Sequence, residues 1–259
     1  MNNDRIKVSV VMPSYNDEKF IKESVFSVLN QTHNNVELIV VDDCSSDSSF
    51  DLVKSIKDDR ICLYRNETNR GAAYSRNFAI AHATGDYIAF LDGDDIWKED
   101  KLEKQLKFMT DNNYDFSYTN YEWINSNSEK LGIIRTGPKK VTNRMLRKSD
   151  YIGCLTVMYR KTVFPDLCIP NDIKKRNDYA LWLLLSERAD CYLLDEVLAS
   201  YRRQDKGLSS SKKADLFKYH IKLFKSLYGF KGFKAFIYSL RNVFYYYVRG
   251  AKYKKKIKS

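Results

Sequence analysis

Three short polar clusters each follow an apolar run that is typical of a buried strand. They are Pro13-Ser14-Tyr15-Asn16, Asp42-Asp43 and Asp92-Gly93-Asp94-Asp95. Because the carboxyl ends of parallel strands meet at one edge of a sheet, we expect these carboxylates and the Tyr15 ring to lie together. Crowded carboxylates repel one another, and a hard divalent cation, Mg²⁺ or Mn²⁺, removes that repulsion. The sequence therefore predicts a metal site whose coordination is completed by substrate phosphate oxygens.

A turn is the simpler role for Asp92, Asp94 and Asp95, since Asp and Gly both favour turns. Two further features favour the metal site. One is the Asp42-Asp43 pair at a neighbouring strand end, and the other is Tyr15, a ring on which a base can stack. A dinucleotide-binding dehydrogenase is excluded, because no G-x-G-x-x-G follows the first strand.

The first 98 residues alternate strand and helix patterns. Strand–helix repetition with short links implies parallel strands joined by right-handed crossovers. The expected fold class is therefore α/β, with a mostly parallel, Rossmann-like sheet flanked by helices. Strands are expected over 8–12, 36–41, 60–64 and 87–91, and helices over 18–30, over 71–83 and around Val53, the last capped by Ser46 or Asp47.

The pattern changes after residue 98, where helices and strands no longer alternate regularly. After Ser209-Ser210-Ser211 the composition shifts to Lys with Phe and Tyr, so we expect a boundary there. Between these points we expect a helix over 101–109, a hairpin of strands at 116–124 and around Ile133, a strand over 152–159, a helix over 178–188 and an extended segment over 192–201.

The overall composition bounds the class of protein. The chain has 259 residues, of which 44% are hydrophobic, as in globular domains. No apolar run approaches the roughly 18 residues that a membrane-spanning helix needs. The five cysteines are scattered and form no CxxC pair, which indicates reduced thiols in a cytosolic protein rather than disulfides or a zinc site.

The net charge of +11 is concentrated in one segment. Residues 212–259 hold fourteen Lys and Arg and a single acid, Asp215, and aromatic residues are interleaved with the lysines. We expect a basic aromatic helical tail that lies on an anionic membrane surface. Packing against the body or a partner is the main alternative. Nucleic-acid binding is a weaker one, so no nucleic-acid partner is expected.

Five motifs, in family order and spacing, resemble family 2 glycosyltransferases with the GT-A fold. The resemblance continues to about Ser211 and leaves the tail outside it. Within the family, the segment 152–159 is similar to bacterial transferases of the teichuronic-acid and capsule type. The resemblance implies a GT-A domain over 1–211, with a nucleotide-sugar-binding half at 1–98 and an acceptor-binding half at 99–211, followed by the tail at 212–259. The five motifs are Val8–Asn16, Leu29–Thr32, Val40–Asp47, Asn69–Asn77 and Gly85–Asp95.

The resemblance also implies roles for individual side chains. Tyr15 would stack on or flank a uracil, and Asp43 would accept a hydrogen bond from it. Asp92 would contact the ribose or the metal, and Asp94 would bind the metal directly. The implied donor-binding residues are Pro13, Tyr15, Asn16, Asp43, Arg70, Arg76, Asp92, Gly93 and Arg202, and the implied metal ligands are Asp94 and Asp92.

A second family motif, Glu-Asp followed by an aromatic residue and then Leu-Trp, supplies the catalytic base. The matching segment here is Asn177-Asp178-Tyr179-Ala180-Leu181-Trp182, so Asp178 matches the base and Asn177 departs from the usual Glu. One carboxylate that removes the acceptor proton during direct displacement gives inversion. From the residues alone, Asp178 also suits the N-cap of the helix that begins there.

A third family feature is Tyr-Arg followed by a His that reaches the diphosphate. The segment here is Tyr201-Arg202-Arg203-Gln204, in which that His is absent. Arg202 or Arg203 is therefore expected to take over as the phosphate contact.

The resemblance implies a metal-dependent inverting hexosyl- or N-acetylhexosaminyltransferase that uses a UDP-sugar. The expected acceptor is a hydroxyl of a lipid-linked glycan in cell-surface polysaccharide biosynthesis, reached at the cytoplasmic face of the cell membrane. One alternative is a nucleotidyltransferase of related fold, although the loop after Met12 has Pro and Tyr where such enzymes carry glycines. The other is a non-catalytic carbohydrate-binding protein, although Asp43, Asp94 and Asp178 are retained.

Overall fold

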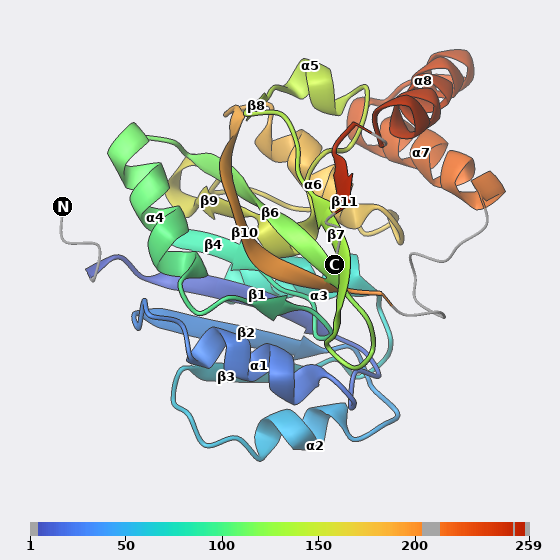
Figure 1. Cartoon of the computed structure of the whole chain (residues 1–259). Helices are drawn as coiled ribbons and strands as arrows, with labels where there is room; N and C mark the ends of the chain where they lie inside the picture. Colours follow the sequence, from blue (N-terminus) through green and yellow to red (C-terminus); the bar gives the residue numbers. More distant parts are fainter. Residues whose placement is uncertain (1–4, 204–212, 251, 257–259) are drawn as a thin grey trace.

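The computed structural model describes residues 5–203, 213–250 and 252–256, and its first third alternates strands with helices. These elements are β1 (Val8–Ser14), α1 (Ile21–Leu29), β2 (Val36–Asp42), α2 (Ser49–Lys54), β3 (Ile61–Arg65), α3 (Ala72–His82) and β4 (Tyr87–Phe90). The strands lie in the order β3-β2-β1-β4, and each neighbouring pair is parallel (Figure 1). Their carboxyl ends therefore meet at one edge of the sheet, as the sequence predicts.

The next part of the chain extends this sheet with strands of both directions. β6 runs parallel to β10 and antiparallel to β7 and β9, and β9 joins β6 to β4. The sheet is therefore mixed beyond β4. The β6–β7 hairpin connects two neighbouring strands directly, so these two strands are antiparallel. The elements are β5 (Ile96–Trp97), α4 (Lys101–Asn112), β6 (Phe116–Ile124), β7 (Lys130–Arg135), β8 (Lys140–Val141), α5 (Asn143–Leu146), β9 (Met158–Arg160), α6 (Asn177–Leu185) and β10 (Cys191–Arg202), with single 3-10 turns at Cys154–Thr156 and Lys161–Val163.

Helices cover both faces of the parallel strands, which explains why these strands are continuous apolar runs. Val11 of β1 belongs to a buried cluster with Ala79 of α3 and Leu181 of α6. Its neighbour Val10 belongs to a second cluster, with Val25 of α1 and residues of α4. Successive side chains of a strand point to opposite faces, so β1 supports both clusters at once.

The strand expected over 152–159 is wrong for most of its length. Only its last two residues belong to a strand, because β9 begins at Met158 and a 3-10 turn occupies Cys154–Thr156. Gly153 lies so close to the ring of Tyr121 that a Cβ would stand 2.7 Å from a ring carbon, and Thr156 Oγ1 donates to the Gly153 carbonyl at 2.6 Å. The segment is apolar because it is buried, not because it is extended.

The segment predicted as a tail packs on the body along its inner side. It forms α7 (Lys213–Tyr228), α8 (Gly232–Gly250) and β11 (Lys254–Lys256), and β11 pairs antiparallel with β7. Leu223, Phe224 and Ala235 are buried in the cluster that contains α6. The segment is helical over α7 and α8, and its inner side packs against the body. No described helix is both long enough and apolar enough to cross a membrane.

The buried carboxylate of Glu37 lies at the amino ends of the parallel strands, opposite their carboxyl ends. It accepts hydrogen bonds from Ser9 Oγ (2.5 Å), Lys7 Nζ (2.7 Å) and the Thr84 backbone N–H (2.6 Å). Burial alone would raise the pKa of Glu37, but these donors lower it from the ordinary 4.5 to about 2. The carboxylate thereby connects β1, β2 and the segment that precedes β4.

Replacing Glu37 with Gln is expected to lower the free energy of unfolding by roughly 1–3 kcal/mol at neutral pH, because its donors lose a charged acceptor. The carboxylate stabilises the folded state above its unfolded pKa of 4.5, and this contribution is lost as the pH falls towards the folded value of about 2. Urea unfolding of Glu37→Gln and wild type should therefore show a difference that narrows on acidification. A difference of constant size from neutral to acid pH would contradict this role.

Candidate active site

The Asp92–Asp95 turn begins just beyond the end of β4, at the carboxyl edge of the parallel strands. Gly93 lies against the loop after β1, so closely that a Cβ would stand 2.5 Å from Asp17 Oδ2. Its carbonyl oxygen accepts a hydrogen bond from Ser24 Oγ of α1 at 2.9 Å. Glycine thus lets the turn approach a carboxylate beyond the end of the neighbouring strand.

Asp17 is a member of this cluster that sequence reasoning missed. Its Oδ2 accepts hydrogen bonds from the Tyr15 backbone N–H (3.0 Å) and Ser14 Oγ (3.1 Å). Burial, and then the charges of Asp94 and Asp92, raise the pKa of Asp17 to about 7. The available signal was its position, since it directly follows the first polar cluster.

Asp95 experiences the same crowding from a fully buried position. Burial, and then the charges of Asp94 and Asp92, raise the pKa of Asp95 well above its usual range. Its Oδ1 accepts the Arg202 backbone N–H at 2.9 Å, which opposes part of that effect. Negative charge at this edge is therefore only partly compensated by the protein.

The cluster fits a hard divalent cation, since its donor set consists of carboxylate oxygens. Within the described part of the chain, no group of three or more His, Cys, Asp or Glu side chains could hold a metal ion alone. A cation here would therefore need oxygen ligands from a substrate in addition to Asp92 and Asp94. Mg²⁺ sites that complete their coordination with substrate phosphates have this character.

Arg76 of α3 connects the Asp92 turn to α6. Its guanidinium donates to the Asp92 carboxylate through Nη2 and to the Asn177 side-chain oxygen through Nη1. The arginine is buried, and although burial opposes its charged form, the charges of Asp92 and Asp178 help to raise the pKa of Arg76. One side chain therefore holds the first turn of α6 beside the carboxylate cluster.

Asp178 lies in this first turn of α6. The helix begins at Asn177, and its N-cap residue Arg176 has a left-handed φ of 62° and makes no side-chain capping bond. Asp178 is therefore not the N-cap, and its half-buried carboxylate lies in the first turn of the helix. Burial raises the pKa of the neighbouring Asp150 to about 6, with Arg176 lowering it and Asp178 raising it. Asp178 is thus close to both Arg76 and Asp150.

Asp43 holds the turn that precedes α3. Its Oδ1 accepts the Arg70 backbone N–H (2.8 Å) and Asn66 Nδ2 (2.7 Å), and its Oδ2 accepts the Gly71 N–H (2.7 Å). Gly71 has a φ of +87°, a conformation that favours glycine. The Arg70 guanidinium lies 3.6 Å from the centre of the Tyr74 ring. Contacts of Asp43 and Arg70 with a nucleotide-sugar donor stay predictions.

The loop after β1 is fixed to the loop after β2. Asn16 has a φ of 57°, its backbone N–H donates to Ser45 Oγ (3.0 Å), and its Oδ1 accepts the Ser46 N–H (2.9 Å). Tyr15 is 49% exposed, whereas Pro13 is buried within β1. Asn16 is exposed as well, but of these three Tyr15 alone presents an exposed aromatic ring to a planar ligand, and its stacking role stays a prediction.

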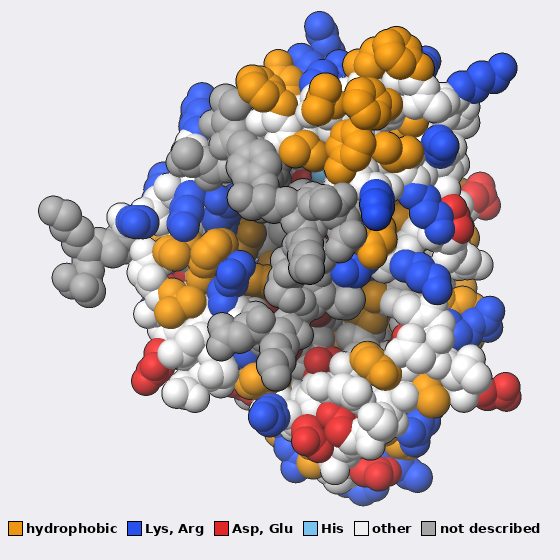
Figure 2. All heavy atoms as spheres, turned by 90° about the vertical axis from the view of Figure 1, so that its right-hand side faces the viewer, with side chains coloured by type: hydrophobic (Ala, Val, Ile, Leu, Met, Phe, Trp, Pro, Cys, Tyr) orange, Lys and Arg blue, Asp and Glu red, His pale blue; other side chains and the backbone are white. Residues whose placement is uncertain are grey.

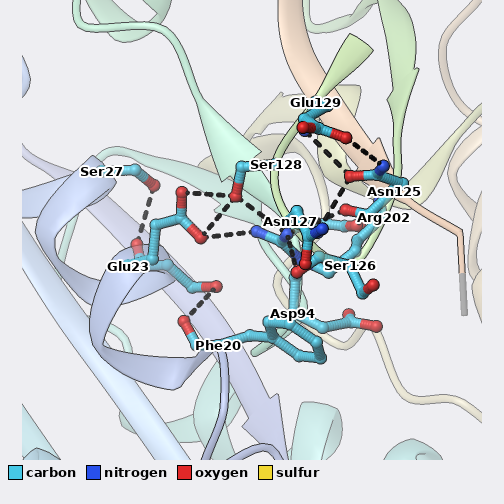
Figure 3. A network of polar contacts seen from close by, with 12 residues as sticks. Phe20, Glu23, Ser27, Asp94, Asn125, Ser126, Asn127, Ser128, Glu129 and Arg202 are labelled. Atoms are coloured by element: carbon cyan, nitrogen blue, oxygen red, sulfur yellow. Dashed lines mark hydrogen bonds and ion pairs between the residues drawn. The ribbon is translucent and has the colours of Figure 1, made fainter. Parts of the chain in front are cut away.

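Arg202 lies at the end of β10 with a fully buried side chain (Figure 3). Its Nε donates to the Asp94 carbonyl oxygen (2.8 Å), its Nη2 to Glu23 Oε2 (2.6 Å), and its Nη1 to Ser128 Oγ (2.9 Å). The guanidinium thus joins α1, the β6–β7 turn and the Asp94 turn. Its donors face the protein, so its observed role is to support Asp94.

Arg203 points elsewhere, with its exposed guanidinium 4.8 Å from the centre of the Trp123 ring. Gln204, where the family His is absent, lies outside the described residues. A phosphate contact by Arg202 or Arg203 stays a prediction.

Lysine at position 202 would keep the charge but lose the planar donor set that reaches three segments. We expect Arg202→Lys to lower the free energy of unfolding by about 2 kcal/mol, since buried acceptors lose their donors. The neighbouring Arg203→Lys is the matched control and should cost much less, because that side chain is exposed. Urea unfolding of both variants measures this, and equal effects would contradict the supporting role of Arg202.

The fold resembles that of solved glycosyltransferases. The structure of Staphylococcus aureus TarS in complex with UDP-GlcNAc matches with a TM-score of 0.69 at 24% identity, over 84% of this chain. This chain spans 65% of the solved TarS chain, which comprises residues 1–349. The architecture therefore defines the class of fold as GT-A.

Sequence comparison gives the family within this class. Residues 9–166 match the family model for glycosyl transferase family 2. The putative teichuronic acid biosynthesis glycosyltransferase TuaG of Bacillus subtilis is 42% identical over 215 residues, covering 82% of this chain and 85% of TuaG. The UDP-Glc:alpha-D-GlcNAc-diphosphoundecaprenol beta-1,3-glucosyltransferase WfgD of Escherichia coli is 41% identical over 215 residues, covering 82% and 83%. The chain belongs to glycosyl transferase family 2.

Proposed function

We propose that this protein is a metal-dependent inverting transferase that moves a hexosyl or N-acetylhexosaminyl group from a UDP-sugar to a hydroxyl of a lipid-linked glycan. It would act in cell-surface polysaccharide biosynthesis, peripherally at the cytoplasmic face of the membrane. The similarity to WfgD supports these classes, because its name gives UDP-Glc as donor and a diphosphoundecaprenol-linked sugar as acceptor. The fold shared with TarS, solved with UDP-GlcNAc, supports a UDP-sugar donor.

The observation that carries the proposal is the bridge made by Arg76. It binds Asp92 on one side and Asn177 on the other, so Asp178, the next residue of α6, lies near the carboxylate cluster without being part of it. A base and a diphosphate site must be separated in this way, because direct displacement brings the acceptor opposite the leaving group. The bonds of the buried Arg76 side chain to Asp92 and to the buried Asn177 support that arrangement.

Asp178 would accept the proton of the acceptor hydroxyl as the oxygen attacks the anomeric carbon. A sugar hydroxyl is a poor nucleophile while protonated, and a positioned carboxylate removes the proton in the transition state. No second nucleophile takes part in this scheme, so the configuration inverts once. Arg76 holds the first turn of α6 in place through Asn177, and it also balances negative charge next to the base.

Asp94 and Asp92 would hold Mn²⁺ or Mg²⁺, which neutralises the charge that develops on the departing nucleoside diphosphate. Gly93 lets the Asp92–Asp95 turn lie against α1, and Arg202 holds the backbone of Asp94. Tyr15 would contact the uracil from the exposed end of β1. The protein thereby orients the donor while keeping the Asp94 turn rigid.

The first test replaces Asp178 with Asn, which keeps size and polarity but removes the proton acceptor. Turnover should fall on the order of 10²–10⁴-fold, while UDP affinity stays close to wild type. The assay follows UDP release from UDP-Glc and UDP-GlcNAc, with extracted membranes as the acceptor source. Asp166→Asn, on an exposed aspartate, is the control. Turnover of Asp178→Asn near the wild-type rate would assign the base elsewhere.

The second test concerns the metal. We expect Asp94→Asn to abolish transfer while its thermal unfolding stays close to wild type, because the carboxylate is half-exposed and serves the cation rather than the fold. EDTA should inactivate the wild type, and added Mn²⁺ or Mg²⁺ should restore it. Full wild-type activity in excess EDTA would refute metal dependence.

A further inference from the structure

α8 presents two different faces. Its inner face is buried, with Ala235, Ser239 and Asn242 among the buried residues, and Asn242 Nδ2 donates to the Tyr179 hydroxyl. Its outer face is apolar although it is exposed. Five large apolar side chains recur there at helical spacing: Phe233 (77% exposed), Phe236 (45%), Ile237 (45%), Leu240 (54%) and Phe244 (61%).

This apolar stripe forms a continuous patch on the surface. Figure 2 shows hydrophobic side chains gathered at the top of the face, where α7 and α8 lie, with Lys and Arg side chains around them. Scattered exposed apolar residues are ordinary, but a contiguous patch rimmed by charge is a feature of interaction sites. The helix therefore has an exposed apolar face next to its buried face.

A basic pocket opens beside the stripe, between α5 and α8. It has a volume of about 330 Å³, and Arg241 lines it, immediately following Leu240 of the stripe. Within the described part of the chain, none of the four cations that line this pocket forms an ion pair with an acid. The lining residues are Asn143, Arg144, Arg147, Lys148, Tyr238 and Arg241.

Two of the three arginines of the pocket lie over aromatic rings. The Arg147 guanidinium lies 4.4 Å from the centre of the Tyr228 ring, and that of Arg241 lies 4.4 Å from the Tyr238 ring. Arg241 Nη2 also approaches the Arg147 carbonyl oxygen at 3.5 Å. Cations that are ordered but not neutralised suit a phosphate group, which brings the missing negative charge.

The apolar stripe and the basic pocket together match the chemistry of a phospholipid. A phosphate headgroup and an apolar chain lie side by side in a lipid, as the pocket and the stripe do on α8. The segment 212–259 carries fourteen basic residues and one acid, so its charge is complementary to an anionic leaflet. A second copy of the chain is a poorer occupant, because two such basic faces repel each other.

We propose that the outer face of α8, with the basic pocket between α5 and α8, is a docking surface for an anionic phospholipid leaflet. The rings of the stripe enter the headgroup boundary, and the pocket holds lipid phosphate. The carboxyl ends of the parallel strands and α8 lie on the same side of the molecule (Figure 1). Docking therefore brings the active-site edge towards a lipid-linked acceptor, a benefit that rests on the proposed function.

The apolar contribution is tested with the full-length chain and sedimented vesicles. Phe233→Gln/Leu240→Gln should bind vesicles containing phosphatidylglycerol at least about tenfold more weakly than wild type. The control Phe26→Gln/Leu131→Gln changes two exposed apolar residues outside α8 and should bind like wild type. UDP release without vesicles, measured separately, should be unchanged in both double variants, so failed docking is distinguishable from a failed enzyme.

The charged contribution is tested in the same assay. Arg144→Gln/Lys148→Gln should weaken binding to the anionic vesicles about tenfold, and high salt should weaken wild-type binding. The control Lys54→Gln/Lys107→Gln removes the same charge from exposed positions on α2 and α4 and should change binding much less.

Three results would overturn the proposal. One is equal binding of the α8 variant and its control. Another is wild-type binding to pure phosphatidylcholine vesicles as strong as to anionic ones. The third is a wild-type dimer in lipid-free solution that the α8 variant converts to monomer, which would assign the stripe to a second copy.

Discussion

Crowding of carboxylates at the carboxyl edge of the parallel strands is the constraint around which the rest of this protein is arranged. Asp17, Asp92, Asp94 and Asp95 lie together there, and burial and mutual repulsion raise the pKa of Asp17 and Asp95. Such a cluster destabilises a fold unless positive charge or hydrogen-bond donors face it. Asp17 has local donors in Ser14 and Tyr15, whereas Asp92 and Asp95 accept from arginines in distant parts of the chain.

Two buried arginines provide most of that support, and in doing so they join separate elements. Arg76 extends from α3 to the Asp92 carboxylate and to the first turn of α6. Arg202 extends from β10 to α1, to the β6–β7 turn and to the Asp94 backbone. The candidate site is therefore assembled from both halves of the chain, and its geometry depends on long-range ion pairs rather than on one loop. The remaining negative charge suits a divalent cation that arrives with a diphosphate.

The sequence predicted the parts of this site that follow from local pattern and topology. Strand–helix repetition implied parallel strands, and the apolar runs that end in Asp42-Asp43 and Asp92–Asp95 are two of these strands. Parallel strands bring those carboxylates to one edge of the sheet. Asp17 directly follows the first polar cluster, but its contact with the Asp92–Asp95 turn depends on the close approach at Gly93, which the sequence alone does not show. The support given by Arg202 was missed because it depends on the pairing of β10 with β6.

Burial also explains where the fold departed from expectation. The turn within the segment 152–159 is fully buried, and an apolar run of that length does not distinguish a strand from a buried turn. In α8, apolar residues face both the body and the exterior, so composition alone did not separate packing from membrane contact. Helical spacing does separate the buried face from the exposed face once the buried positions 235, 239 and 242 are known.

The central claim is that the carboxylate edge binds a divalent cation together with the donor diphosphate. The most direct measurement is a titration of the protein with Mn²⁺ by electron paramagnetic resonance, with and without UDP. Mn²⁺ alone should bind weakly, because no three-ligand group exists in the described part of the chain. UDP should strengthen binding at least about tenfold, with Mn²⁺ strengthening UDP binding by the same factor. Tight Mn²⁺ binding without UDP, or UDP affinity that is indifferent to Mn²⁺, would contradict the central claim.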